Sequence, residues 1–323
     1  MVKHTHRQLA PWLIMIVFMF VVLSYERSIL LLATTNVVNV VFMHMIKPNS
    51  STSKPTTCDT KVLQAWPITL LQWSLSINSA QSTTYLAMGR WAIYAGCPKT
   101  AITWLSQAIP SPMASYELGQ IYDATGNTAE AVRNYQVIPT VALTYIRAGR
   151  AAMHAENWSL AQYKFKLAVR IAPQNPIAHY ALGESLLYNP PRDITMGITE
   201  LQTAIQMGYT DPFVYSRIAH GYAMNGRYDQ AMEILNNRNL DNALANAIRG
   251  DVYLARGDPS RAVVAYQKSL QQEPESARIY ANLGKAYLEN GAQEQAIQSW
   301  KHALEISPEF APALEALQKI NQP

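Results

Sequence analysis

The apolar and small residues of this chain recur in a unit of about 34 residues. The stretch that starts at Ala277 shows the unit most clearly. Its positions 4, 7, 8, 11, 15, 20, 24, 27 and 32 hold Tyr280, Leu283, Gly284, Tyr287, Gly291, Ala296, Trp300, Ala303 and Pro308. Apolar residues three or four apart share one face of a helix, so each unit predicts two helices joined by a turn near position 15.

The same template fits seven times along the chain. The units start at Ser82, Pro112, Ala142, Pro176, Pro212, Ala243 and Ala277. Position 8 is glycine in six units, position 20 is alanine or glycine, and position 24 is always large and apolar. Small residues at 8 and 20 let two antiparallel helices approach closely, and the residue at 24 fills the space beside them. Glycine at position 15 in five units suits a left-handed residue at the end of the first helix.

This spacing closely resembles the tetratricopeptide repeat. The resemblance implies an all-α fold, an alpha-solenoid in which antiparallel helix pairs form a right-handed superhelix. The seven repeats would cover residues 82–310, preceded by a partial leading helix in 62–81 and followed by a capping helix in 311–323. The fourth repeat departs from the pattern, because Pro190 and Pro191 stand in its turn.

The N-terminal residues 1–46 are predicted to be a membrane anchor. Residues 9–25 form an uncharged apolar run after Lys3 and Arg7, just long enough to span a bilayer as a transmembrane helix. Residues 28–46 are also apolar and are interpreted as an interfacial continuation. A two-span hairpin turning at Glu26 and Arg27 is the alternative, and a cleaved signal peptide competes with both.

Residues 47–61 are rich in Ser, Thr and Pro and are predicted to be a solvated linker. The net charge of +4 lies entirely within residues 1–61, so the repeats are neutral overall. A neutral body lacks the cationic patch that nucleic-acid binding requires, and we expect no nucleic-acid partner. Basic residues on both sides of the first apolar run leave its orientation nearly balanced. We expect the N-terminus inside and the repeats extracytoplasmic; a cytoplasmic body is the alternative.

Few residues of the sequence are candidates for catalysis or for binding a metal or cofactor. The sequence holds no nucleotide-binding or hydrolase motif, and its seven histidines do not pair on one face of a predicted helix. We therefore expect no catalysis, no cofactor and no metal. Cys58 and Cys97 are candidates for a disulfide if the body lies in an oxidising compartment; otherwise they are two free thiols.

The resemblance also implies a binding face. In proteins with such repeats, positions 2, 5, 9 and 12 of the first helix line a concave groove that holds a protein or peptide ligand. The candidate groove residues here, from positions 5 and 9, are Arg90, Tyr116, Gln120, Arg150, Tyr180, Glu184, His220, Asp251 and Lys285.

These features together predict a non-catalytic, membrane-anchored scaffold or adapter. It would bind other proteins during assembly of an envelope or membrane complex. Two alternatives stay open. One is an accessory subunit or regulator of a membrane transferase or polymerase, and the other is a structural membrane protein that associates with itself as a homo-oligomer.

Overall fold

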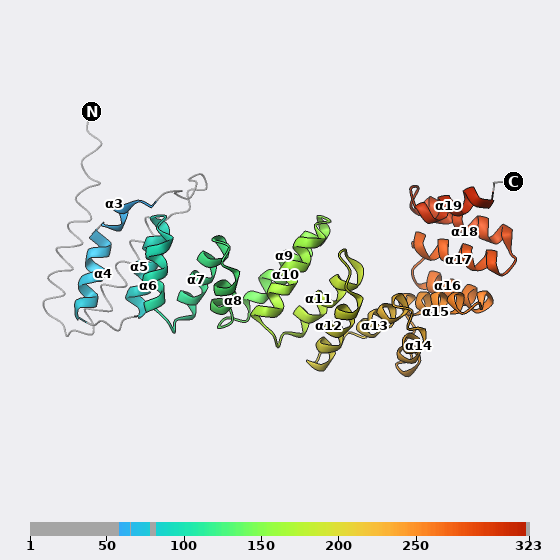
Figure 1. The fold of residues 1–323 in the computed structure, drawn as a ribbon, viewed down its shortest axis with the longest axis horizontal. Helices are drawn as coiled ribbons and strands as arrows, with labels where there is room; N and C mark the ends of the chain where they lie inside the picture. The colour runs from blue at the N-terminus through green and yellow to red at the C-terminus, as the bar shows by residue number, and fades with distance from the viewer. Residues whose placement is uncertain (1–57, 65, 78–81, 321–323) are drawn as a thin grey trace, which may run out of the picture. The chain divides into compact units, whose positions relative to one another are not determined.

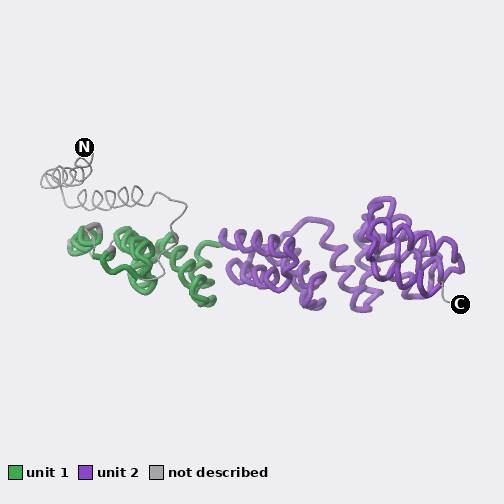
Figure 2. Tube along the Cα trace, turned by 90° about the horizontal axis from the view of Figure 1, so that it is seen from above, with its two compact units in different colours: residues 1–139 green, residues 140–323 purple. Residues whose placement is uncertain are grey.

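The computed structural model describes residues 58–64, 66–77 and 82–320, and every regular element within these ranges is an α-helix (Figure 1). The all-helical repeat fold expected from the sequence is confirmed for this part of the chain. The chain divides into two compact units, residues 1–139 and 140–323 (Figure 2). The predicted anchor over 1–46 lies outside the described residues. Among the described helices, none combines the length and apolar character that a membrane crossing requires.

The described part of the first unit contains two helix pairs, α5 with α6 and α7 with α8, preceded by two further helices, of which the first is short. Its elements are α3 (Thr60–Leu63), α4 (Trp66–Ile77), α5 (Ser82–Tyr94), α6 (Pro98–Gln107), α7 (Pro112–Ala124) and α8 (Thr128–Tyr135). Leu71 of α4 packs against Met88 and Trp91 of α5 in one core cluster, and Leu105 of α6 packs with Leu118 of α7 in the next. Helix α3 begins at Thr60, within the predicted linker. Leu63 at its other end packs against both of these clusters.

The second unit continues the same arrangement with longer helices. Its elements are α9 (Val141–His154), α10 (Trp158–Ile171), α11 (Pro176–Tyr188), α12 (Ile194–Gln206), α13 (Phe213–Met224), α14 (Tyr228–Asn237), α15 (Ala243–Ala255), α16 (Pro259–Gln272), α17 (Ala277–Glu289), α18 (Gln293–Ile306) and α19 (Ala311–Ile320). Odd-numbered helices from α9 to α17 are the first helices of the repeats, and α19 packs on α18 as the cap.

In the six repeats with glycine at position 8, this glycine lies directly against the large residue at position 24. A Cβ atom placed on Gly284 would lie 2.5 Å from Nε1 of Trp300, and one on Gly250 would lie 2.5 Å from Cε1 of Tyr266. In these two repeats a side chain larger than hydrogen therefore does not fit unless the ring shifts, whereas the fifth repeat has Ala219 at this position, beside the smaller Leu235. In the fourth repeat the backbone of the second helix also comes close, since a Cβ on Gly183 would lie 2.9 Å from the carbonyl oxygen of Gly197.

Position 15 lies in the turn between the two helices of each pair. Gly126 and Gly291, for example, have φ of 78° and 80°, the left-handed region that glycine enters without steric cost. The third repeat has Glu156 at this position with φ of 55°, and the fourth has Pro190. Five of the seven first helices begin at the predicted residue, and α9 and α13 begin one residue away from it, at Val141 and Phe213.

Candidate partner-binding face

The candidate residues lie on one stripe of the first helix in each repeat. We call positions 2, 5, 6 and 9 of these helices the first-helix face. In the second unit this face belongs to α9, α11, α13, α15 and α17, and in the first unit to α5 and α7. Each unit is considered by itself below.

Position 9 of one repeat bonds to position 6 of the next. In the first unit, Nε of Arg90 donates to Oε1 of Glu117 at 3.1 Å. In the second unit, Nε of Arg217 donates to Oε1 of Glu184 at 2.6 Å. These partly buried pairs join successive first helices, α5 to α7 and α11 to α13. Glu117 and Arg217 stand at position 6, which was not among the positions predicted for the groove.

Tyr180 sits at the centre of an aromatic cluster beside this ion pair. Its ring stacks on Tyr209 with centroids 4.4 Å apart, and the guanidinium of Arg217 lies 5.5 Å from its ring centroid. The Tyr180 hydroxyl donates to Glu184 at 3.3 Å. Burial, with the nearby Glu184 carboxylate, raises the pKa of Tyr180 well above its usual value. The phenol therefore stays protonated and remains a donor to Glu184.

His220 lies partly buried next to Tyr188. The two rings stack with centroids 5.3 Å apart, and Nδ1 of His220 lies 3.1 Å from the Tyr188 hydroxyl. Burial, together with the positive charges of Arg278 and Arg192, lowers the pKa of His220 to about 4. The imidazole is therefore neutral at neutral pH, and its Nδ1 shares a hydrogen bond with the Tyr188 hydroxyl.

Asp251 anchors the next contact between repeats. The Tyr266 hydroxyl donates to its Oδ1 at 2.7 Å, and Nδ2 of Asn282 donates to the same atom at 2.9 Å. Arg278 adds an ion pair at 3.7 Å. Burial raises the pKa of Asp251, while these partners favour its charged form. Asp251 is thus held by neighbouring repeats, in a structural arrangement.

The remaining candidates are more open. Nε2 of Gln120 donates to the Tyr116 hydroxyl at 2.9 Å, and Tyr116 is exposed. Arg150 is exposed on α9, and Lys285 lies 3.8 Å from Glu289 within α17. Among the nine candidates, hydrogen bonds within the described residues join two pairs, Tyr116 with Gln120 and Tyr180 with Glu184.

Position 2 carries exposed apolar side chains that were not named as candidates from the sequence. Leu143, Ile177 and Phe213 occupy it on α9, α11 and α13, with 39%, 40% and 45% of their surface exposed. In the first unit, Met113 holds the same position and is 47% exposed. An apolar residue at the same place in four consecutive repeats is a signal that the aligned sequence already contained.

Cys58 and Cys97 form a disulfide, with Cα atoms 4.6 Å apart. The bond ties the residues before α3 to the buried turn between α5 and α6, where the amide of Asp59 also donates to the carbonyl of Ala95 at 2.9 Å. Within the described ranges, no group of three His, Cys, Asp or Glu side chains could hold a metal ion.

Family models match two overlapping parts of the second unit. A model described as a TPR repeat matches residues 250–291, and one described as a tetratricopeptide repeat matches residues 277–310. Residues 250–310 therefore match tetratricopeptide repeats. Such repeats are typically non-catalytic modules that bind other proteins. A comparison with curated protein sequences gives no significant match.

Solved structures with similar folds include three with a named source. A tetratricopeptide repeat protein from Parabacteroides merdae has 18% identity over 73% of this chain and 97% of its own, with a TM-score of 0.47. MamA from Desulfovibrio magneticus has 17% identity over 52% and 96%, with a TM-score of 0.41. The human IFIT1 dimer with m7Gppp-AAAA has 15% identity over 75% and 64%, with a TM-score of 0.47. At these identities the similarity concerns the helical-repeat fold alone.

Proposed function

We propose that this protein is a non-catalytic scaffold that binds other proteins through the first-helix face of its repeats. Residues 1–46 hold it to a membrane, the repeats lie on the extracytoplasmic side, and the bound partners belong to an envelope complex whose assembly it assists. The observation that carries the proposal is the row of exposed apolar residues at position 2.

The row is unusual because of its regularity. Single exposed apolar residues are common on protein surfaces, but Leu143, Ile177 and Phe213 stand at the same position of three successive first helices. Arg147 and Arg150 are also exposed, one and two turns after Leu143 on α9. A segment with apolar side chains and at least one carboxylate complements this surface.

The disulfide supports the proposed compartment. Cys58 and Cys97 are bonded, and disulfides persist mainly in extracytoplasmic compartments because cytosolic thiols are kept reduced. A repeat body that carried this bond in the cytosol would be an exception to that rule.

Photo-crosslinking in native membranes tests the binding face. A photoreactive amino acid replaces Ile177 or Phe213 in the full-length chain, and Val264 of α16, which is 65% exposed, serves as the control position. We expect a discrete crosslinked protein from the first two positions and none from Val264. The charge-reversal pair Arg147→Glu and Arg150→Glu should weaken the crosslink, whereas Arg133→Glu on α8 should leave it unchanged.

Equal crosslinking from Val264, or a crosslink that the arginine reversals leave intact, would contradict binding through this face. The compartment is tested separately by adding protease outside spheroplasts. We expect the repeats to be cut while a cytoplasmic marker survives. Survival of the repeats, while a known exported control is cut, would refute the extracytoplasmic placement.

A further inference from the structure

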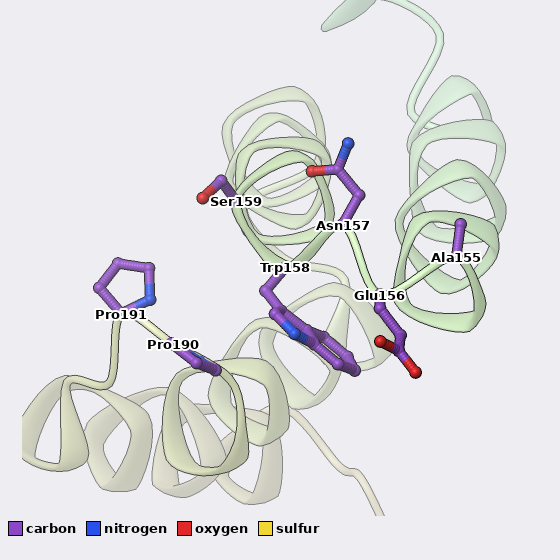
Figure 3. Close-up of a pocket in the computed structure, with 7 residues that line it drawn as sticks. All are labelled: Ala155, Glu156, Asn157, Trp158, Ser159, Pro190 and Pro191. Carbon is purple, nitrogen blue, oxygen red and sulfur yellow. The ribbon is translucent and has the colours of Figure 1, made fainter.

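Two consecutive repeats lack glycine at position 15, and their turns meet at one pocket. The turn from α9 to α10 has Glu156, and the turn from α11 to α12 has Pro190. The pocket has a volume of about 480 Å³ (Figure 3). Its lining residues are Ala155, Glu156, Asn157, Trp158, Ser159, Pro190 and Pro191. It lies on the turns, away from the first-helix face.

The backbone of Glu156 is in a conformation that disfavours a side chain. Its φ of 55° is left-handed, where five other repeats use glycine. A glutamate here is less favourable than glycine, because its Cβ crowds the backbone in this region. Strained residues are found more often at functional sites than elsewhere. The strained backbone does not indicate which ligand would bind. The class of ligand has to be inferred from the residues that line the pocket.

The opposite wall is held from beneath by a buried amide. Nε2 of Gln162 on α10 donates to the carbonyls of Asn189 and Pro191, both at 3.0 Å. Gln162 is almost fully buried, so these bonds fix the proline turn against α10. The pocket therefore has a defined wall on the side of Pro190 and Pro191.

The walls combine flat apolar rings with one negative charge. Figure 3 shows the Trp158 indole between the Glu156 carboxylate and Pro190. Glu156 is the only charged residue among the lining residues. The C-terminal ends of α9 and α11, which carry partial negative charge, also reach this site.

The N-terminus of α10 offsets only part of the negative charge around the pocket. A helix N-terminus carries about half a positive charge. Here the side chain of Asn157 caps it by accepting from the amide of Leu160 at 3.2 Å. The full charge of Glu156 outweighs the remainder, so the pocket favours a cation. An indole face is the best aromatic partner for a cation, which would sit over Trp158 and pair with Glu156.

We propose that this pocket binds a lysine or arginine side chain of a protein partner, between the Trp158 indole, the proline wall and the Glu156 carboxylate. This site goes beyond the first-helix face, and it adds a basic residue to the description of what the scaffold recognises. Its failure would leave binding at the first-helix face untouched.

Fluorine NMR of the full-length chain in detergent, labelled with fluorotryptophan, tests the proposal. The chain has seven tryptophans, and the signal of Trp158 is the one that disappears in Trp158→Phe. The probes are the capped tripeptides Gly-Lys-Gly and Gly-Arg-Gly, with Gly-norleucine-Gly as the uncharged control. We expect a saturable shift of the Trp158 signal with the basic peptides and none with the norleucine peptide.

Substitutions then separate binding from folding. Glu156→Gln should weaken binding by up to about fivefold, the loss expected for one solvent-exposed ion pair. Glu233→Gln, on the exposed side of α14, is the matched control and should change nothing. Glu156→Gly should weaken binding to the same degree yet raise the denaturation midpoint, because glycine relieves the strained φ.

An equal shift with the norleucine peptide would overturn the proposal, as would unchanged affinity in Glu156→Gln or in Glu156→Gly. The pair Arg147→Glu and Arg150→Glu should leave peptide binding intact. If that pair abolished the peptide shift, the cation site would not be separate from the first-helix face, and the proposal would fall.

Discussion

Replacing Gly284 by alanine is a direct test of the close helix crossing within a repeat. The new Cβ would lie 2.5 Å from Nε1 and 2.7 Å from Cε2 of Trp300. The indole cannot simply move away, because it is buried and its Nε1 donates to the carbonyl of Ala281 at 3.0 Å. One of these contacts must give way.

The expected size of the effect follows from two opposing terms. Forcing an extra methyl group into a packed core costs about 1–3 kcal/mol. Alanine in place of glycine favours a helix interior by about 1 kcal/mol. The balance predicts that Gly284→Ala lowers the free energy of unfolding by up to about 2 kcal/mol.

Urea unfolding of the full-length chain in detergent, followed by circular dichroism, measures this change. The same substitution is made in a Trp300→Leu background, where space is available beside position 284. There only the helix propensity remains, so alanine should raise stability by about 1 kcal/mol. The two backgrounds then differ by a coupling energy of about 1–3 kcal/mol, the size of the overpacking cost.

Whether Gly284 is needed for close packing is decided by the sign of the change in unfolding free energy in the natural background. If Gly284→Ala stabilised the protein there by as much as in the Trp300→Leu background, the glycine would not be needed for close approach, and the packing argument would be refuted. Gly250→Ala, opposite Tyr266, repeats the test in the preceding repeat.

Three further predictions concern stability. Reducing the bond between Cys58 and Cys97, which are 39 residues apart, should lower the unfolding free energy by up to about 4 kcal/mol; an unchanged urea midpoint in dithiothreitol would contradict this. The unfolded chain protonates His220 near its ordinary pKa of 6.5, but the folded chain does so only near 4. Stability should therefore fall by about 3 kcal/mol as the pH drops from 6.5 to 4, and His220→Gln should flatten that slope in pH-dependent denaturation. Asp251→Ala leaves the buried Tyr266 hydroxyl without its acceptor and should cost about 1–3 kcal/mol by the same assay, while a loss as large in Asp251→Asn would argue against the hydrogen bond.

The repeat architecture could be read from the sequence because it depends on local patterns. Small residues at positions 8 and 20 and a large one at 24 fix the helix pair, and each requirement is visible within 34 residues. The glycine at position 15 likewise gives the end of the first helix. These features need no knowledge of distant contacts, so the helix starts agree to within one residue.

The candidate face could be located only in part. Positions 5 and 9 were named, but what their side chains contact depends on the spacing between successive helices. Arg217 reaches Glu184 across 33 residues, and Tyr209 from the next loop stacks on Tyr180. The ion pair joins two successive repeats, and the stacked pair joins the first helix of one repeat to the loop at that repeat's end, so neither lies within a single helix pair. As a result, several residues considered for ligand binding turn out to join neighbouring repeats.

The pocket at Glu156 could not be predicted, although its unusual residues were visible in the sequence. Its two unusual residues, Glu156 and Pro190, were visible as departures from the repeat. Pro190 was read as an irregular turn, and nothing in the sequence said that the two turns line one cavity. A position that departs from the repeat pattern is therefore as informative as a regular one, because the usual residue at that position favours the fold.

The bond between Cys58 and Cys97 also determines how mechanical tension would travel through an anchored protein. A pull on the N-terminal side of Cys58 passes through the disulfide directly to Cys97, at the start of α6. The residues between the two cysteines, which include α3, α4 and α5, lie in a closed loop outside the load path. The first repeats would then feel force only from α6 onward, and α4 could keep covering the apolar face of α5 while the rest of the chain is under strain.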